Sequence, residues 1–191
     1  MLIFNLRHEA IRNAMSTSTV RRTPKARRED LQPDAITLLK ADHEYVDELF
    51  KSFGKINGNS KKKTELVKDI CAELRAHTTV EEEIFYPAVR AALKKEKMLV
   101  DEADVEHALA KQLISELEDM KAGDDHYDAK VIVLGEYIRH HVREEHTEMF
   151  PKVKKSTIDL HDLGGRIQQR KLELKNGMST SILAALAMAP M

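Results

Sequence analysis

Two copies of one pattern, 77-HTTVEEEIFYP-87 and 141-HVREEHTEMFP-151, decide the fold of this chain. In each copy a His is followed four residues later by a Glu, and a Pro stands ten residues after the His. A further His lies 34 residues before each copy, at His43 and His107. Corresponding residues of the two halves are 64 positions apart. This spacing predicts two helical hairpins that each carry half of one site.

Each half contains two segments in which apolar residues recur at spacings of three and four, the pattern of one helix face. The segments span about 34–54, 61–86, 101–121 and 126–150. We expect Asp34 to cap the first helix and Pro87 and Pro151 to kink or end theirs. No segment alternates with a period of two. The pattern therefore predicts an all-α protein, with the four helices in an antiparallel up-down bundle.

The chain divides into three parts on composition. Residues 1–33 are rich in Ser, Thr and Arg, and we expect a basic, flexible arm, with an organelle presequence or a nucleic-acid-touching arm as alternatives. Residues 34–155 are the predicted bundle. Residues 156–191 are predicted to form a peripheral helix, interrupted at Gly164-Gly165, and a loosely ordered tail beyond Asn176.

Composition narrows the possible functions. The net charge is −1 and the sequence pI about 6.8, so no global field attracts nucleic acid or a membrane surface. No apolar run is long enough to cross a membrane. The single Cys71 cannot form an intramolecular disulfide, which favours a reducing compartment. We expect a cytoplasmic protein that is a monomer or a weak oligomer.

Six polar residues interrupt the apolar stripes: His43, His77, Glu81, His107, His141 and Glu145. Burying a carboxylate costs several kcal/mol unless it is paired or bound to a metal. One inward His is ordinarily a hydrogen-bonded core residue, but six such residues in a two-fold repeat indicate a metal site. Imidazole and carboxylate without thiolate suit iron, manganese or zinc.

The number of carboxylates favours a bridged pair of metals over a single ion. If both Glu side chains bridge, each metal receives two His and two carboxylate oxygens. A ferritin-like di-iron bundle would instead show Glu-x-x-His on two helices and a lone Glu on the other two. Here the order is His-x-x-x-Glu and the lone residues are His, so the ferritin-like arrangement is disfavoured.

Residues beside the six ligands allow two interpretations. Asp42 and Glu106 precede the lone histidines, and they either orient a ligand imidazole or lie on the surface. His140 and His146 are rotated ~100° from their ligand neighbours round the helix, so we expect them outside the site. Tyr86 either lines the pocket or serves only in packing.

The paired His-x-x-x-Glu segments that end in Phe/Tyr-Pro resemble the hemerythrin-like, or HHE cation-binding, family, over about residues 36–155. The resemblance implies a four-helix bundle with a carboxylate-bridged, non-haem di-iron site that binds O2 or related small ligands. It implies that His43 and His77 serve one iron and that His107 and His141 serve the other. Glu81 and Glu145 would be the bridges.

The chain departs from the family at the third helix. True hemerythrins carry two His four residues apart there, whereas the residues four positions from His107 are Ala103 and Lys111. The first hypothesis is a di-iron protein that binds or senses O2, NO or iron. The alternative is an oxidoreductase that decomposes peroxide at the same site. The missing His favours redox turnover over reversible O2 carriage.

Overall fold

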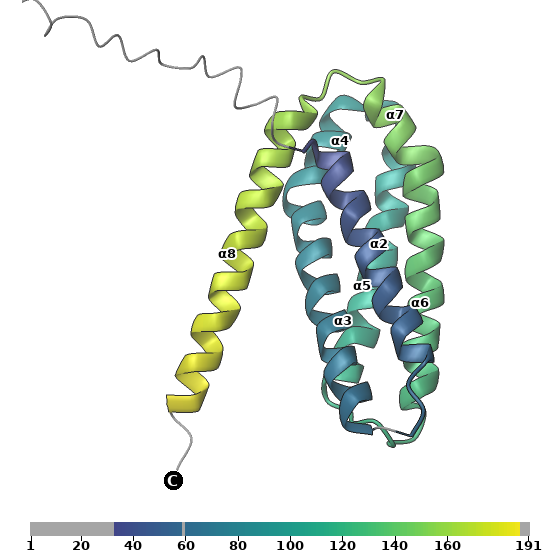
Figure 1. The fold of residues 1–191 in the computed structure, drawn as a ribbon. Coiled ribbons are helices and arrows are strands. Elements are labelled where there is room, and N and C mark those ends of the chain that lie inside the picture. Colours follow the sequence, from purple (N-terminus) through teal and green to yellow (C-terminus); the bar gives the residue numbers. More distant parts are fainter. Residues whose placement is uncertain (1–32, 59, 188–191) are drawn as a thin grey trace, which may run out of the picture. The chain divides into compact units, whose positions relative to one another are not determined.

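The computed structural model describes residues 33–58 and 60–187, with side chains up to Gly177. This part of the chain is all-helical and contains no strand, which confirms the predicted fold class. Most of the predicted flexible arm, residues 1–32, lies outside the described residues. The four main helices pack together as a bundle (Figure 1). They are α2 (Ala35–Gly54), α3 (Ser60–Val80), α5 (Lys97–Glu118) and α6 (Tyr127–Glu144).

The bundle core is apolar at both ends and polar in the middle. Each helix buries the face that its apolar spacing predicts. One apolar cluster contains Ile36 and Leu39 of α2, and a second contains Val46 and Phe50 of the same helix. His43 lies between the two clusters along α2, and the other five predicted ligands occupy corresponding places on their helices. The core therefore has a polar layer between two apolar layers.

Both proline-ended segments contain a wide helical turn. The π-turn η1 (Glu81–Phe85) leads into α4 (Tyr86–Ala92), and η3 (Glu145–Met149) leads into α7 (Phe150–Lys154). The N–H of Tyr86 donates to the carbonyl of Glu81, and the N–H of Phe150 donates to that of Glu145.

Of the two expected roles of the prolines, to kink or to end the helix, the second is wrong. Pro87 and Pro151 do not end their helices, because both lie in the first turn of the helix that follows. Proline lacks an N–H and crowds the carbonyl four residues earlier. The π-turn widens the helix at that point, so the chain stays helical and only its register shifts. Single π-turns inside helices often mark functional sites, and here each begins at a predicted bridging Glu.

After α4, a short 3-10 turn η2 (Lys94–Glu96) leads into α5. The C-terminal helix α8 (Leu160–Ala187) runs through Gly164 and Gly165, so the predicted interruption is wrong, and the helix continues past Asn176. A Cβ on Gly164 would lie 2.5 Å from the carbonyl oxygen of Pro33. Glycine is therefore needed there for close packing of two backbones, not for a break.

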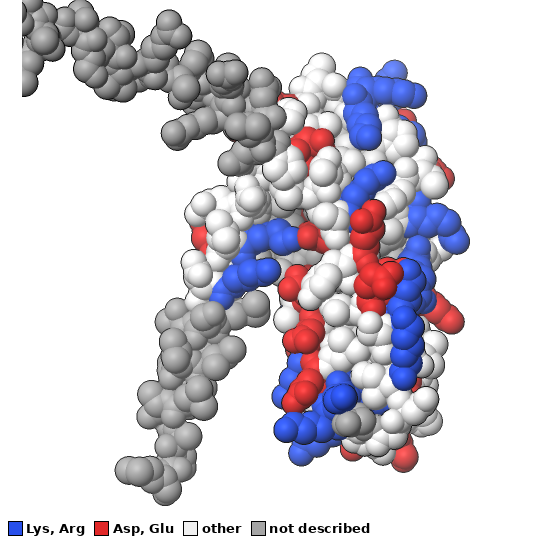
Figure 2. All heavy atoms as spheres, in the orientation of Figure 1, with Lys and Arg blue, Asp and Glu red and all other residues white. Residues whose placement is uncertain are grey.

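The helix α8 packs against α2, α3 and η1. Its Lys171 forms an ion pair with Asp42 of α2, and its Arg170 forms one with Glu83 of η1. On the face shown in Figure 2, basic and acidic side chains are interleaved. None of the described helices is long and apolar enough to cross a membrane.

Candidate metal centre

The polar layer brings all six predicted ligands together. Their side chains are buried, with exposed fractions between 0% for Glu81 and 6% for His43. Donor atoms of His43, His77, Glu81 and Glu145 all lie within 4.8 Å of one another, and those of Glu81, His107 and His141 do the same. Glu81 belongs to both groups. The helices thus supply two adjoining sets of donors, one centred on each predicted His pair.

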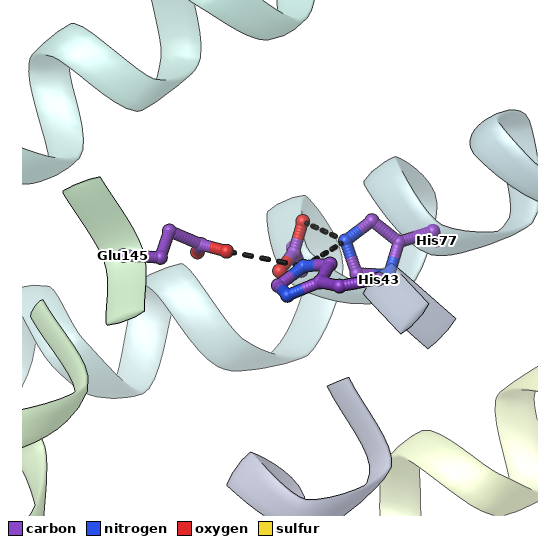
Figure 3. Close-up of side chains that lie close together, drawn as sticks. His43, His77 and Glu145 are labelled. Carbon is purple, nitrogen blue, oxygen red and sulfur yellow. Dashed lines mark hydrogen bonds and ion pairs between the residues drawn. The ribbon is translucent and has the colours of Figure 1, made fainter. Parts of the chain in front are cut away.

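The four imidazoles turn the same nitrogen inward. His43 Nε2 lies 2.9 Å from His77 Nε2, and His107 Nε2 lies 3.2 Å from His141 Nε2. Figure 3 shows His43 between His77 and Glu145. The spacing of the sequence explains the pairing, because each lone His is on the helix that precedes its partner in the same hairpin.

The two carboxylates lie where they can reach both pairs. Glu81 Oε2 is 3.1 Å from His77 Nε2 and 3.4 Å from His107 Nε2. Glu145 Oε2 is 3.3 Å from His43 Nε2 and 3.8 Å from His141 Nε2. Despite these distances, both oxygens of Glu81 and Oε2 of Glu145 lack a partner with hydrogen-bond geometry. A buried carboxylate without partners is costly, and cations placed among these oxygens and nitrogens would satisfy it.

Two buried carboxylates, Glu81 and Glu145, lie side by side in the polar layer, and their negative charges repel each other. Burial opposes ionisation of Glu81, but the His77 and His107 imidazoles outweigh it and hold its pKa well below the usual value. Burial and the negative charge of Glu81 together raise the pKa of Glu145 well above the usual value. Burial opposes protonation of His77, yet Glu81 and Asp42 raise its pKa to about 10. Metal cations in the layer would remove this conflict, because they stabilise ionised carboxylates and neutral imidazoles together.

The second imidazole nitrogens point outward to acceptors. His77 Nδ1 lies 3.3 Å from Asp42 Oδ2, and His141 Nδ1 lies 2.7 Å from Glu106 Oε2. Of the two interpretations of these acids, the structure therefore places both against an imidazole. Each contacts the His of the partner helix, not the His that follows it in sequence. A carboxylate on the outer nitrogen fixes the tautomer that leaves Nε2 free to bind a metal.

The other two outer nitrogens have different acceptors. His107 Nδ1 lies 3.0 Å from Glu82 Oε1, and His43 Nδ1 lies 2.9 Å from His146 Nε2. The expectation that His146 is outside the site is wrong, because the rotation turns its ring toward the neighbouring α2 helix. The repeat contained the missed signal, since Glu82 and His146 occupy the same position of the two copies. His140 is exposed, as expected.

Tyr86 breaks the symmetry of the layer. It is 1% exposed, and its hydroxyl donates to Glu145 Oε1 at 3.2 Å. The Tyr86 hydroxyl oxygen also lies 3.3 Å from His107 Nε2 and 3.4 Å from His141 Nε2. The corresponding residue of the second copy is Phe150, whose ring stacks on His43 with centroids 6.1 Å apart. One half of the site therefore contains a phenol hydroxyl where the other has only an aromatic ring.

The two copies of the motif and the helices that carry them match one known protein family. Residues 34–153 match the hemerythrin HHE cation-binding domain. The chain belongs to the hemerythrin HHE cation-binding family. The match covers the whole four-helix region with both His-x-x-x-Glu copies. Neither residue four positions from His107 replaces the missing fifth family histidine, because Ala103 packs in the apolar core and Lys111 donates to Glu82.

A solved structure supports the hemerythrin fold. The crystal structure of a hemerythrin HHE cation-binding domain-containing protein from Mycobacterium kansasii superposes with a TM-score of 0.67. The two sequences are 23% identical, and the match covers 82% of this chain and 93% of the other. At this sequence identity, the structural similarity supports a shared fold and nothing further. No curated protein sequence matches the chain significantly.

Proposed function

We propose that this hemerythrin-family bundle binds two iron ions and uses them to bind or sense a small ligand: O2, NO or iron itself. His43 and His77 would hold one iron, and His107 and His141 the other, with Glu81 and Glu145 as bridges. The observation that carries the proposal is the set of four inward Nε2 atoms around buried carboxylate oxygens without hydrogen-bond partners. The donor set suits iron, manganese or zinc, and the family resemblance favours iron.

The bound iron pair would supply redox-active, coordinatively open metal for a diatomic or peroxide ligand. The residues of the chain do the rest. Outward acceptors such as Asp42 and Glu106 hold the ligand imidazoles in one tautomer. The apolar clusters above and below keep the layer shielded from bulk water. A groove of about 310 Å³ between α2 and α6, lined by His43, Phe50 and Val142 among others, borders the site and would be the approach for a small molecule.

The position of Tyr86 supports a second function, the decomposition of peroxide. Cleavage of peroxide to water requires protons at the oxygen atoms, and a buried phenol beside Glu145, His107 and His141 is placed to donate one. Two molecules of peroxide would yield two of water and one of O2, so no external electron donor is needed. The missing family histidine also favours turnover over reversible carriage.

One experiment separates these functions. Purified protein is analysed for metal and then exposed under controlled conditions to O2, NO and peroxide while its optical spectrum is recorded. We expect close to two irons per chain, and a reversible band with O2 or NO supports binding. Evolution of O2 from peroxide supports the enzyme instead. The Glu81→Ala variant is the control, since loss of a bridge should remove metal and every one of these responses. A variant that keeps both metals contradicts the bridge assignment.

A further inference from the structure

The two halves of the metal layer differ in what holds the outer nitrogen of the lone histidine. Three of the four ligand imidazoles have a carboxylate there: Asp42 for His77, Glu106 for His141 and Glu82 for His107. Only His43 has a second imidazole, with Nδ1 2.9 Å from His146 Nε2. The two rings lie close, with centroids 5.1 Å apart.

The difference arises at one position of the repeat. Glu82 and His146 each follow the bridging Glu directly, and each is the second residue of its π-turn. The same backbone geometry therefore delivers an anion to the outer face of His107 and an uncharged ring to the outer face of His43. Lys111 donates to the other oxygen of Glu82 at 2.6 Å, so Glu82 is held between an imidazole and a lysine ammonium.

A carboxylate that accepts the Nδ1–H hydrogen bond makes the imidazole more basic, so that Nε2 binds a metal more strongly. Loss of such a partner typically lowers metal affinity about 10- to 100-fold. An imidazole has no negative charge with which to do this. If both bridging carboxylates are shared, each metal has the same number of protein donors. The acceptor behind the lone histidine then decides which metal is held less firmly.

We propose that His146 makes the metal at His43 and His77 the exchangeable one of the pair, while Glu82 anchors the metal at His107 and His141. This inference rests on the proposed dinuclear site. Two further contacts point the same way. The groove between α2 and α6 is lined by His43 and so borders that half of the layer. The other half is closed over by the Tyr86 hydroxyl.

The test follows the release of iron. Protein loaded anaerobically with Fe(II) is mixed with an excess of a coloured Fe(II) chelator, and the colour is recorded over time. Wild-type protein should release one iron in a fast phase and one in a slow phase. The His146→Glu variant places a carboxylate behind His43, and we expect its fast phase to slow by about 10-fold or more. The Glu82→Gln variant keeps an acceptor without the charge, and its slow phase should accelerate by a similar factor.

Two controls make the result specific. Thr147→Glu adds the same negative charge one residue further along the exposed side of η3, and it should leave both phases unchanged. His146→Gln changes the side chain without adding charge, so its fast phase should lack the slowing expected for His146→Glu. Circular dichroism confirms that each variant is folded before release is measured.

Several outcomes would overturn the inference. A single release phase in wild-type protein does so, and so does a His146→Glu variant with an unchanged fast phase, or a Thr147→Glu variant that slows release equally. The failure of the dinuclear site itself is recognised earlier, because the loaded protein would then contain fewer than two irons before any chelator is added.

Discussion

Asp34 shows how a single side chain starts the fold. Its Oδ1 accepts from the backbone N–H of Thr37 at 3.0 Å, and its Oδ2 accepts from the Thr37 hydroxyl at 2.8 Å. Partial burial opposes ionisation of Asp34, but these hydrogen bonds outweigh it and lower its pKa. The folded state therefore favours the ionised carboxylate, which also suits the positive end of the helix dipole. The N-cap predicted from sequence is confirmed.

This contact has a pH dependence that can be measured. Because the folded pKa is depressed, its stabilisation is fully present above the unfolded pKa of about 3.9 and is lost as pH falls through the folded value. We expect Asp34→Ala to lower the free energy of unfolding by about 1 kcal/mol at pH 7 and by less near pH 3. Denaturant unfolding of metal-free protein at both pH values measures this. Asp34→Asn is the control and should stay close to wild type at pH 7. An equal penalty for Asp34→Ala at both values would falsify the account.

At the same scale, the sequence predicted the inward ligands better than their outer acceptors. An inward position follows from helical periodicity, and all six predicted side chains are buried. The acceptor of an imidazole depends on which neighbouring helix faces its outer nitrogen. His146 reaches His43 across a separation of 103 residues, and periodicity within one helix contains no information about that contact. The repeat places Glu82 and His146 at one equivalent position, but the imidazole that each contacts lies on another helix.

At the scale of elements, Gly164 decides how closely α8 approaches α2. A Cβ at this position would lie 2.5 Å from the carbonyl oxygen of Pro33 and 2.9 Å from the backbone nitrogen of Ala35. Both atoms belong to backbone, which cannot move aside as a flexible side chain can. Leu163 and Ile167 on the same helix are buried. They can pack against the bundle only if the backbone of α8 at Gly164 lies this close to the start of α2.

The paired glycines allow a matched test. We expect Gly164→Ala to lower the free energy of unfolding by up to about 2 kcal/mol, because overpacking costs about 1–3 kcal/mol and the gain in helix propensity offsets about 1 kcal/mol. Gly165→Ala meets nothing within 4 Å and should stabilise the protein by up to about 1 kcal/mol. Urea unfolding of the two variants gives both values. Equal effects of the same sign would show that α8 does not pack through Gly164.

The prolines show why element boundaries were harder to predict than element faces. A proline inside a helix is expected to kink or end it, and at Pro87 the chain continues as helix through a π-turn and α4. The continuation is stabilised by tertiary packing, because Phe85, Tyr86 and Val89 are buried on either side of the proline. A rule based on neighbouring residues counts the backbone hydrogen bond that proline removes. It does not count the apolar surface that the following residues bury against other helices.

At the scale of the whole molecule, metal and fold are coupled through the polar layer. Without metal, the bundle has to bury Glu81 and Glu145 next to each other, and burial together with the Glu81 charge raises the pKa of Glu145 well above its usual value. A metal that binds only the folded protein stabilises it by mass action, by about 2.7 kcal/mol per site when free metal is 100 times the dissociation constant.

We therefore expect removal of metal to lower the thermal midpoint. For a domain of this size, about 1 kcal/mol corresponds to roughly 2–4 °C, so saturating a site to that degree should shift the midpoint by roughly 5–10 °C. Scanning calorimetry of metal-free protein, before and after addition of Fe(II) under anaerobic conditions, measures the shift. The Glu81→Ala variant should show little or none. A shift of equal size in that variant would mean that the metal acts outside the polar layer.

The sequence by itself determined the helical class, the buried face of each main helix and the two-fold set of six polar residues. Spacings of three and four residues define the buried face of a helix, and the spacing of 64 residues relates the two equivalent hairpins. Only the tertiary structure decided which side chain supports each imidazole, where Tyr86 places its hydroxyl and how α8 meets α2. The physical reason is that these contacts join surfaces of different helices, and their partners are chosen by packing in three dimensions.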